Sequence, residues 1–277
     1  MKKFIDTLLI IMIILTGLSL FLYPTVSNYL SEQNGSQAIN RYTGQVSVLD
    51  EGAGEAELAR AERYNEALYR SSIDAEPTSV SQSDYEYMLN LSGDGMIGYI
   101  DIPRIGVRLP ICHGTDGKTL ESCVGHMPSS SLPVGGESTH CVLTGHTGMP
   151  SAKLLTDLNH MQTGDRFTVT TLNRCLTYEV ESVTVVVPDE TESLRIRRGE
   201  DLCTLVTCTP YGLNTHRLLV TGHRVAESEP EEVSLRESFA DALLNDPIMM
   251  AFAALLVMLM LTYAVTKIGI KRDQEKI

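Results

Sequence analysis

The hydrophobic and polar residues follow three different patterns along the chain. Two long apolar runs, residues 7–23 and 248–266, lie near the two ends and contain no charged residue. Apolar residues at spacings of three and four over residues 58–68 indicate an amphipathic helix. From residue 96 the chain consists of short runs rich in Val, Ile, Thr and Tyr, separated by Gly, Pro, Asn and Asp, and this pattern predicts β-strands.

The strand-like runs between residues 96 and 223 indicate the architecture of the middle of the chain. They are MIGYIDI, VRLPI, HCVLTG, RFTVTT, CLTYEVESVTVVV, LCTLVTC and RLLVTGH. Seven or eight short strands of this kind predict a closed barrel or a sandwich. A short helix is expected at residues 151–158, a stalk at 24–50 and a long polar loop at 71–95. Long ordered loops in compact domains are often lids or binding loops.

Both apolar runs have the length of a membrane-spanning helix. They hold seventeen and nineteen residues, and about 20 apolar residues cross a bilayer. A cleaved signal peptide is the alternative for the first run, but no small-x-small cleavage site follows it. A buried core helix is the alternative for the second, which is apolar all round and ends in a charged tail. The sequence therefore predicts two uncleaved anchors.

Charges beside the runs predict the orientation of the chain. Basic residues precede the first run and follow the second, whereas the charged residues that flank the runs on their inner sides are mostly acidic. The outer set is Lys2, Lys3, Lys267, Lys271, Arg272 and Lys276, and the inner set is Glu32, Glu237, Asp241 and Asp246, against Arg236. The positive-inside rule then puts both termini in the cytoplasm and residues 24–247 outside. The net charge of −13 argues against a nucleic-acid partner.

The six cysteines show no zinc-binding pattern. They stand at positions 112, 123, 141, 175, 203 and 208, and no C-x-x-C pair occurs. An exported domain can form disulfides, but several of these cysteines are flanked by apolar strand residues. That setting is typical of buried single thiols. We therefore expect no disulfide, no metal site and no cofactor.

One cysteine faces an arginine across a predicted hairpin. The run TLVTC ends at Cys208, eight residues containing Pro, Gly and Asn follow, and the next run opens on Arg217. If the two runs pair antiparallel, the thiol and the guanidinium lie at the same end of the sheet. The cation can then favour the thiolate and stabilise an oxyanion. The alternative is a buried structural cysteine beside a surface arginine.

A thiol nucleophile also needs a proton partner, and the spacing leaves the choice open. Among seven histidines, His146 follows a strand-like run between two glycines, but His140 and His216 are nearly as well placed. No G-x-S-x-G or H-E-x-x-H motif occurs, and the nucleotide-binding patterns match only in part. The sequence therefore favours cysteine chemistry over serine, zinc or nucleotide chemistry.

The segments around these residues resemble one enzyme family. TLVTCTPYGLNTHRLLVTGHR resembles the catalytic segment of sortases, and SSLPVGGESTHCVLTGHTGMPSAKLLTDL resembles their histidine region. GYIDIPRIGVRLPICHGT resembles the opening strands of their barrel. The resemblance implies a closed eight-stranded β-barrel with short helices, flanked by N- and C-terminal transmembrane helices. The amino-acid sequence of the histidine region and the presence of two apolar runs are most similar to class C, the pilus-assembling sortases.

The resemblance also assigns roles. It implies that Cys208 is the nucleophile, His146 the general acid and base, and Arg217 the group that binds the substrate and its oxyanion. The implied reaction cleaves an LPXTG-like sorting signal between Thr and Gly through a thioacyl intermediate. A pilin lysine, or a cell-wall precursor amine in an anchoring sortase, then takes the acyl group. A membrane-tethered cysteine protease and a non-catalytic peptide-binding module are the alternatives.

The implied organisation places a catalytic domain outside a Gram-positive cell membrane. We expect a cytoplasmic N-terminus and first helix (1–23), a stalk, amphipathic helix and loop (24–94), the catalytic barrel (95–226), an acidic linker (227–246), a second helix (247–270) and a cytoplasmic tail (271–277). Class C relatives carry an Asp-Pro-aromatic lid motif. Here Asp84-Tyr85 lacks the proline, and Glu76-Pro77 is followed by Thr78.

Overall fold

The structure is a computed structural model and describes residues 2–74 and 82–226. The expected second membrane helix, the acidic linker, the tail and part of the polar loop therefore lie outside the described residues. The chain divides into two units, and the larger, Leu30–Leu235, carries the β-structure. Each unit is described by itself.

Three helices precede the strands. They are α1 (Lys2–Val48), α2 (Glu51–Asp74) and α3 (Gln82–Tyr87). Helix α2 confirms the amphipathic helix, whereas residues 24–48, expected as a stalk, continue α1 through Pro24. Among the described residues, no helix combines the length and the hydropathy that a membrane span requires, so the anchor expected at residues 7–23 is not confirmed.

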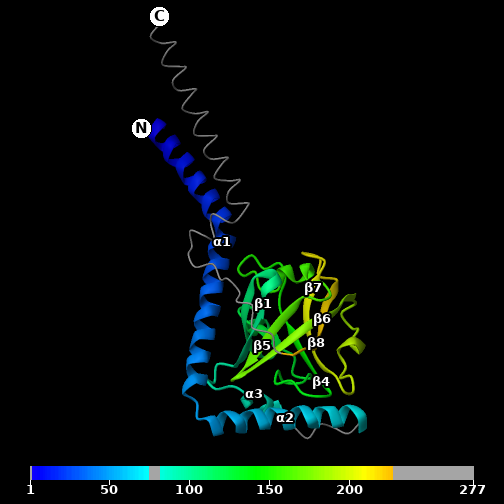
Figure 1. Cartoon of the computed structure of the whole chain (residues 1–277). Coiled ribbons are helices and arrows are strands. Elements are labelled where there is room, and N and C mark those ends of the chain that lie inside the picture. The colour runs from blue at the N-terminus through cyan, green and yellow to red at the C-terminus, as the bar shows by residue number, and fades with distance from the viewer. Residues whose placement is uncertain (1, 75–81, 227–277) are drawn as a thin grey trace, which may run out of the picture. The chain divides into compact units, whose positions relative to one another are not determined.

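The strands close into a barrel (Figure 1), which confirms the fold implied by the resemblance and decides between the barrel and the sandwich that the strand count left open. Their order around it is β1-β2-β3-β4-β7-β8-β6-β5, and β5 pairs back onto β1. Their bounds are β1 (Met96–Ile102), β2 (Val107–His113), β3 (Val124–His126), β4 (Thr139–Thr144), β5 (Arg166–Thr171), β6 (Arg174–Val186), β7 (Asp201–Thr209) and β8 (His216–Arg224). Most pairs are antiparallel, but β2–β3 and β4–β7 are parallel.

Short helices fill the connections between strands. They are η1 (Pro103–Ile105), α4 (Gly117–Leu120), η2 (Thr156–His160) and η3 (Glu192–Leu194). The helix expected at 151–158 is thus a 3₁₀ turn that begins five residues later. Strand β3 was not predicted, because three residues are too few to show a two-residue alternation.

Alternation along each strand sorts side chains between the barrel interior and its outer face. On β7, Cys203 and Leu205 point into the main core, while Val206 belongs to a separate cluster on the outside. The main core also holds Ile100, Phe167 and Val220, all at most 1% exposed. Burial of about 25 cal/mol per Å² of apolar area makes this interior the main source of stability.

Helices α1 and α2 dock onto the barrel through buried polar groups. Within the larger unit, the Tyr42 hydroxyl of α1 donates to the Ile97 carbonyl at 3.0 Å and accepts from the Leu172 amide at 2.9 Å. The Asn65 side chain of α2 both accepts from the Leu132 amide and donates to its carbonyl. Helix α2 lies across one end of the barrel, as Figure 1 shows.

Helix α3 is anchored by Tyr85, which is 3% exposed. Its hydroxyl lies 2.9 Å from His126 Nδ1 and accepts from the Gly114 amide, and its ring meets His113 edge-on at 4.4 Å. His126 Nε2 lies 2.9 Å from the Ser131 carbonyl, so it carries the proton and Nδ1 is the acceptor. Tyr85 therefore belongs to the barrel packing.

One disulfide joins Cys112 on β2 to Cys123, which precedes β3. The expectation of no disulfide was wrong. Apolar neighbours made Cys112 resemble a structural thiol, and it does pack with Ile39, Tyr42 and Met96, but its partner eleven residues later lies beside it after the α4 crossover. The other four cysteines are free thiols.

His113 should make stability depend on pH. Burial lowers the pKa of His113 to about 4, and its Nε2 donates to the Met88 carbonyl at 2.7 Å while its buried Nδ1 has no partner among the described residues. The unfolded chain binds a proton near pH 6.5 and the folded chain does not. The contribution of neutral His113 to the unfolding free energy is therefore fully present above pH 6.5. It is lost as the pH decreases toward 4, by at most about 3 kcal/mol.

The variant His113→Gln isolates this contribution. Glutamine retains a donor for the Met88 carbonyl but does not titrate. Urea unfolding at pH 7.5, 6, 5 and 4.5 should show a steeper loss of unfolding free energy in the wild type than in the variant. Equal losses in both would contradict the role of His113.

Candidate active site

The β7–β8 hairpin brings Cys208 and Arg217 together. The two residues are direct cross-strand partners in the antiparallel ladder. Side chains of such a pair lie on the same face of the sheet, with Cβ atoms about 5 Å apart. The antiparallel pairing expected from the sequence is therefore confirmed, and both side chains are half-buried.

The parallel pair β4–β7 brings His146 to the same place. Every paired residue of β4 faces the β7 residue 62 positions later, from Thr139 with Asp201 to Thr144 with Val206. Two bonds carry this register past the strand end: the Gly145 amide donates to the Val206 carbonyl at 3.0 Å, and the Thr207 hydroxyl donates to the Gly145 carbonyl at 2.8 Å. Continued by two more positions, the same offset of 62 residues would bring His146 opposite Cys208.

The outer face of the barrel carries Cys208 and Arg217. Val142, Val206 and Leu219 form the apolar cluster on this face of β4, β7 and β8. Cys208 and Arg217 lie two residues from Val206 and Leu219, so alternation puts them on the same face, and His146 would join them if the alternation of β4 continued past its last residue, Thr144. We call His146, Cys208 and Arg217 the Cys–His–Arg row. Neighbouring strands are about 4.8 Å apart.

Arg217 is held in place by the hairpin itself. Its Nη1 donates to the carbonyls of Asn214 and His216 at 3.3 and 3.1 Å. A guanidinium has five N–H donors. The rest can therefore bind an oxygen in front of Cys208 while the backbone bonds orient the group.

The other free thiols are less suited to chemistry. Cys141 and Cys203 are partners on β4 and β7 and are 3% and 0% exposed. Burial raises the pKa of Cys203 well above its usual value. Cys175 is half-buried at the start of β6, away from the row. Cys208 is thus a reachable thiol that also has an arginine as its strand partner.

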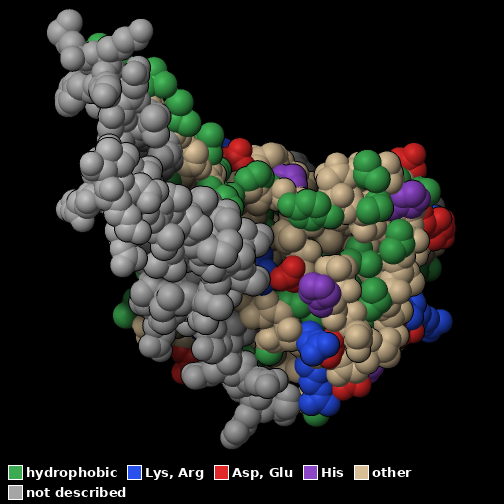
Figure 2. Space-filling model, turned by 90° about the horizontal axis from the view of Figure 1, so that it is seen from above, with side chains coloured by type: hydrophobic (Ala, Val, Ile, Leu, Met, Phe, Trp, Pro, Cys, Tyr) green, Lys and Arg blue, Asp and Glu red, His purple; other side chains and the backbone are tan. Residues whose placement is uncertain are grey.

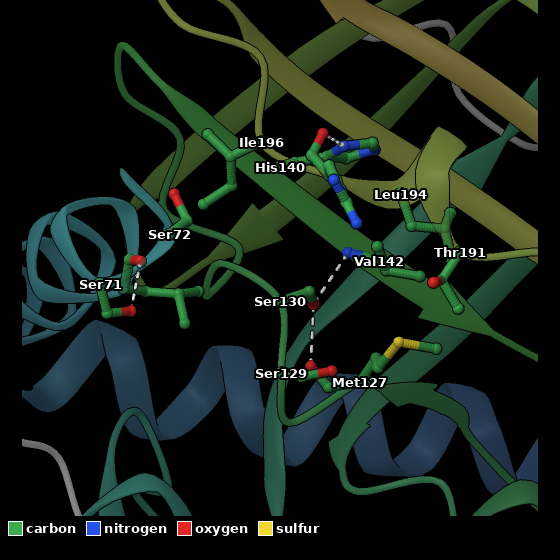
Figure 3. Close-up of a pocket in the computed structure, with 12 residues that line it drawn as sticks. Ser71, Ser72, Met127, Ser129, Ser130, His140, Val142, Thr191, Leu194 and Ile196 are labelled. Carbon is green, nitrogen blue, oxygen red and sulfur yellow. Dashed lines mark hydrogen bonds between the residues drawn. The ribbon is translucent and has the colours of Figure 1, made fainter. Parts of the chain in front are cut away.

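A cavity lies on the same outer face of the barrel, toward the end covered by α2. It has a volume of about 540 Å³ and lies between the start of β4, helix α2 and the β6–β7 connection (Figure 3). Its lining includes Leu68 of α2, Val142 of β4 and Leu194 of η3. Because Leu194 also packs on the cluster of Val142, Val206 and Leu219, the β6–β7 connection forms a wall on the face of the barrel that carries Cys208 and Arg217.

The β7–β8 connection, which joins Cys208 to Arg217, exposes apolar side chains. Tyr211 and Leu213 in the β7–β8 connection are 71% and 73% exposed. Tyr211 also lies over the backbone just after His146, since a side chain at Gly148 would approach its ring to 3.0 Å. The connection lies at the barrel end away from α2, and Figure 2, which views the molecule from above, shows hydrophobic patches among polar surface there.

The remaining histidines divide between structural bonds and the surface. His140 is 1% exposed and bonded on both ring nitrogens, so it is no proton partner for Cys208. His216 lies beside Arg217 but on the opposite face of β8 by alternation.

The wall formed by the β6–β7 connection was not predicted from the sequence, although the apolar Leu194 and Ile196 between charged residues were a signal for it. Among residues 2–74 and 82–226, no cluster of three or more acidic, histidine or cysteine side chains could hold a metal ion.

Several known proteins are similar to this chain. The sortase domain model matches residues 100–225. Sortase D of Bacillus subtilis is 30% identical over 131 residues, which are 46% of this chain and 63% of that protein, so the chain spans less than two thirds of that relative. The crystal structure of sortase C1 from Streptococcus agalactiae is 42% identical, covers 69% of this chain and 100% of its own, and has a TM-score of 0.64.

A structure of Clostridium perfringens sortase C with the C-terminal cell wall sorting motif is also similar. It is 36% identical and has a TM-score of 0.62, with 69% of this chain and 100% of that chain covered. The family model and the similar structures agree on the class of protein. The chain belongs to the sortase family, whose members are cysteine transpeptidases, and similar structures are of sortase C enzymes.

Gly145 allows β4 to pass over Leu155 on the way to His146. A Cβ at this position would lie 2.8 Å from Leu155 Cδ1, and Leu155 is fully buried. We expect Gly145→Ala to lower the unfolding free energy by about 1–3 kcal/mol, because overpacking displaces neighbours. Gly117→Ala is the matched control, since a Cβ there meets nothing within 4 Å. Equal melting temperatures for both variants would contradict this packing.

Proposed function

We propose that this protein is a cysteine transpeptidase that cleaves an LPXTG-like sorting signal and joins it to an amine. The observation that carries the proposal is the Cys–His–Arg row, in which the hairpin partners Cys208 and Arg217 lie at the end of β7 and β8, next to the end of β4 that precedes His146. The wall formed by the β6–β7 connection gives an extended peptide a place to lie beside that row.

The first half of the reaction forms a thioester. The thiolate of Cys208 attacks the carbonyl carbon of the Thr–Gly bond, and the negative charge moves to the carbonyl oxygen. Arg217 donates to that oxyanion, with Nη1 tethered by the hairpin carbonyls. As the tetrahedral intermediate collapses, the C–N bond breaks and the His146 imidazolium gives its proton to the leaving glycine amine.

The second half transfers the acyl group to a new amine. An amine nitrogen attacks the thioester carbon, and neutral His146 accepts the proton that this nitrogen loses. The C–S bond then breaks and restores the Cys208 thiolate. The same histidine therefore acts as acid in one half and as base in the other. Water can replace the amine, in which case the result is hydrolysis.

The preferred acceptor in this proposal is a pilin lysine, which would make the reaction pilus polymerisation. The similarity to sortase C1 of Streptococcus agalactiae at 42% identity over its whole chain supports this choice. The similarity to a sortase C determined with a cell wall sorting motif supports a sorting signal as the donor. A cell-wall precursor amine, as in an anchoring sortase, is the alternative acceptor.

The proposal also places the catalytic barrel outside a cell membrane with both termini in the cytoplasm. The two charge-free runs, residues 7–23 and 248–266, and the basic residues beyond them support this placement. Cysteine-labelling from the outside of intact cells, directed to Cys208, tests it. Labelling only after lysis would contradict it.

Each member of the row should be required for joining. Cys208→Ala removes the nucleophile and His146→Ala the proton carrier, so each should lower the joining rate by on the order of 10⁴-fold or more. Arg217→Lys keeps the charge but loses the fork of donors, so a loss of about 10²–10³-fold is expected. The measurement is mass spectrometry of an LPXTG peptide joined to a lysine-containing peptide, with melting temperature as the check on folding.

Cys175→Ala is the matched control, because it removes another half-buried free thiol away from the row. It should join peptides at the wild-type rate. Joining that persists in Cys208→Ala would end the proposal. Cleaved peptide without joined product, at saturating amine, would identify a hydrolase instead.

A further inference from the structure

His140 has a role that the Cys–His–Arg row does not use. It is the second residue of β4, is 1% exposed and lines the cavity between β4, α2 and the β6–β7 connection. Its Nδ1 lies 2.9 Å from the Arg195 carbonyl in the β6–β7 connection, and its Nε2 lies 2.7 Å from the Thr204 hydroxyl of β7. The ring therefore bridges the connection to the barrel, and the dashed line at His140 in Figure 3 marks the bond to the connection.

These partners fix the tautomer of the ring. A carbonyl oxygen only accepts, so Nδ1 carries the proton and donates to Arg195. Nε2 is then the acceptor for the Thr204 hydroxyl, whose oxygen can accept from the Thr221 hydroxyl at 2.9 Å. Burial lowers the pKa of His140, which keeps the ring neutral at neutral pH. In this series of hydrogen bonds, from Thr221 through Thr204 and His140 to Arg195, each donor has an acceptor.

The bond to Arg195 connects His140 to the wall of the groove. Leu194 and Ile196, the two neighbours of Arg195, line the cavity. Leu194 also packs on the cluster of Val142, Val206 and Leu219, whose last two members lie two residues from Cys208 and Arg217. Fixing the Arg195 carbonyl therefore fixes the apolar wall next to the row.

We propose that His140 is a positioning residue that holds the β6–β7 connection as one wall of the groove for the donor peptide. The role of the groove rests on the proposed function, but the bridge itself does not. His140 lies six residues before His146, about 20 Å along a strand, so it acts through the wall and not on the reacting atoms.

Two conservative variants separate the two ring nitrogens. In His140→Asn the amide nitrogen takes the place of Nδ1 and can donate to Arg195. In His140→Gln it takes the place of Nε2, which leaves the Arg195 carbonyl without its donor. His140→Ala removes both bonds, and the exposed His160→Ala is the matched control.

Limited trypsin digestion tests the bridge without any need for activity. Arg195, Arg197 and Arg198 lie in the connection, so a loosened connection is cut there, and mass spectrometry identifies those cuts. We expect cleavage to be about tenfold faster in the Ala and Gln variants than in the wild type, with the Asn variant and His160→Ala close to wild type. Equal cleavage of the Asn and Ala variants would overturn the bridge.

Kinetics test the positioning role. A lost hydrogen bond should raise KM for an LPXTG donor peptide about three- to tenfold in the Ala and Gln variants, with kcat within about twofold and substantial rescue by Asn. Alkylation of Cys208 by iodoacetamide should proceed at the wild-type rate. Faster trypsin cleavage of the variants with an unchanged KM would overturn the positioning role. A fall in both kcat and the rate of Cys208 alkylation would overturn it as well. A wild-type protein that joins no peptide would refute the proposed function, and the digestion would still decide the bridge.

Discussion

The parallel pairing of β4 with β7 is the interaction on which the site depends. Its constant offset of 62 residues aligns the end of one strand with the end of the other, and two bonds extend the alignment to Gly145 and Thr207, the residues just before His146 and Cys208. A shift by one residue would turn His146 to the opposite face, because side chains alternate. The barrel core on one side and the Val142 cluster on the other both resist such a shift.

The sequence predicts the parts of this arrangement that are local. Seven strand-like runs correspond to β1, β2 and β4–β8, and Cys208 faces Arg217 because a short connection joins their strands. The proximity of His146 could not be obtained in this way. It depends on a parallel pair formed across a long intervening segment, and only the resemblance to sortases distinguished His146 from His140 and His216.

The sequence-based predictions that the structure corrected also have physical explanations. Residues 24–48 are polar enough to resemble a stalk, yet Tyr42 docks α1 onto β1 and onto Leu172, the residue that follows β5. Cys112 looked like a lone buried thiol because the α4 crossover that returns the chain to it has no sequence signal. His140 resembled a catalytic base, since its partners on β7 and in the β6–β7 connection are more than fifty residues away.

Closure of the barrel limits how a peptide can be recognised. Each of the eight described strands has a neighbour on both sides, so none of them offers an open edge to which an extended ligand could add as a further strand. Recognition must then come from side chains and from the connecting segments. Because insertions in such segments leave the barrel intact, relatives can change the peptides they accept by altering loop length alone.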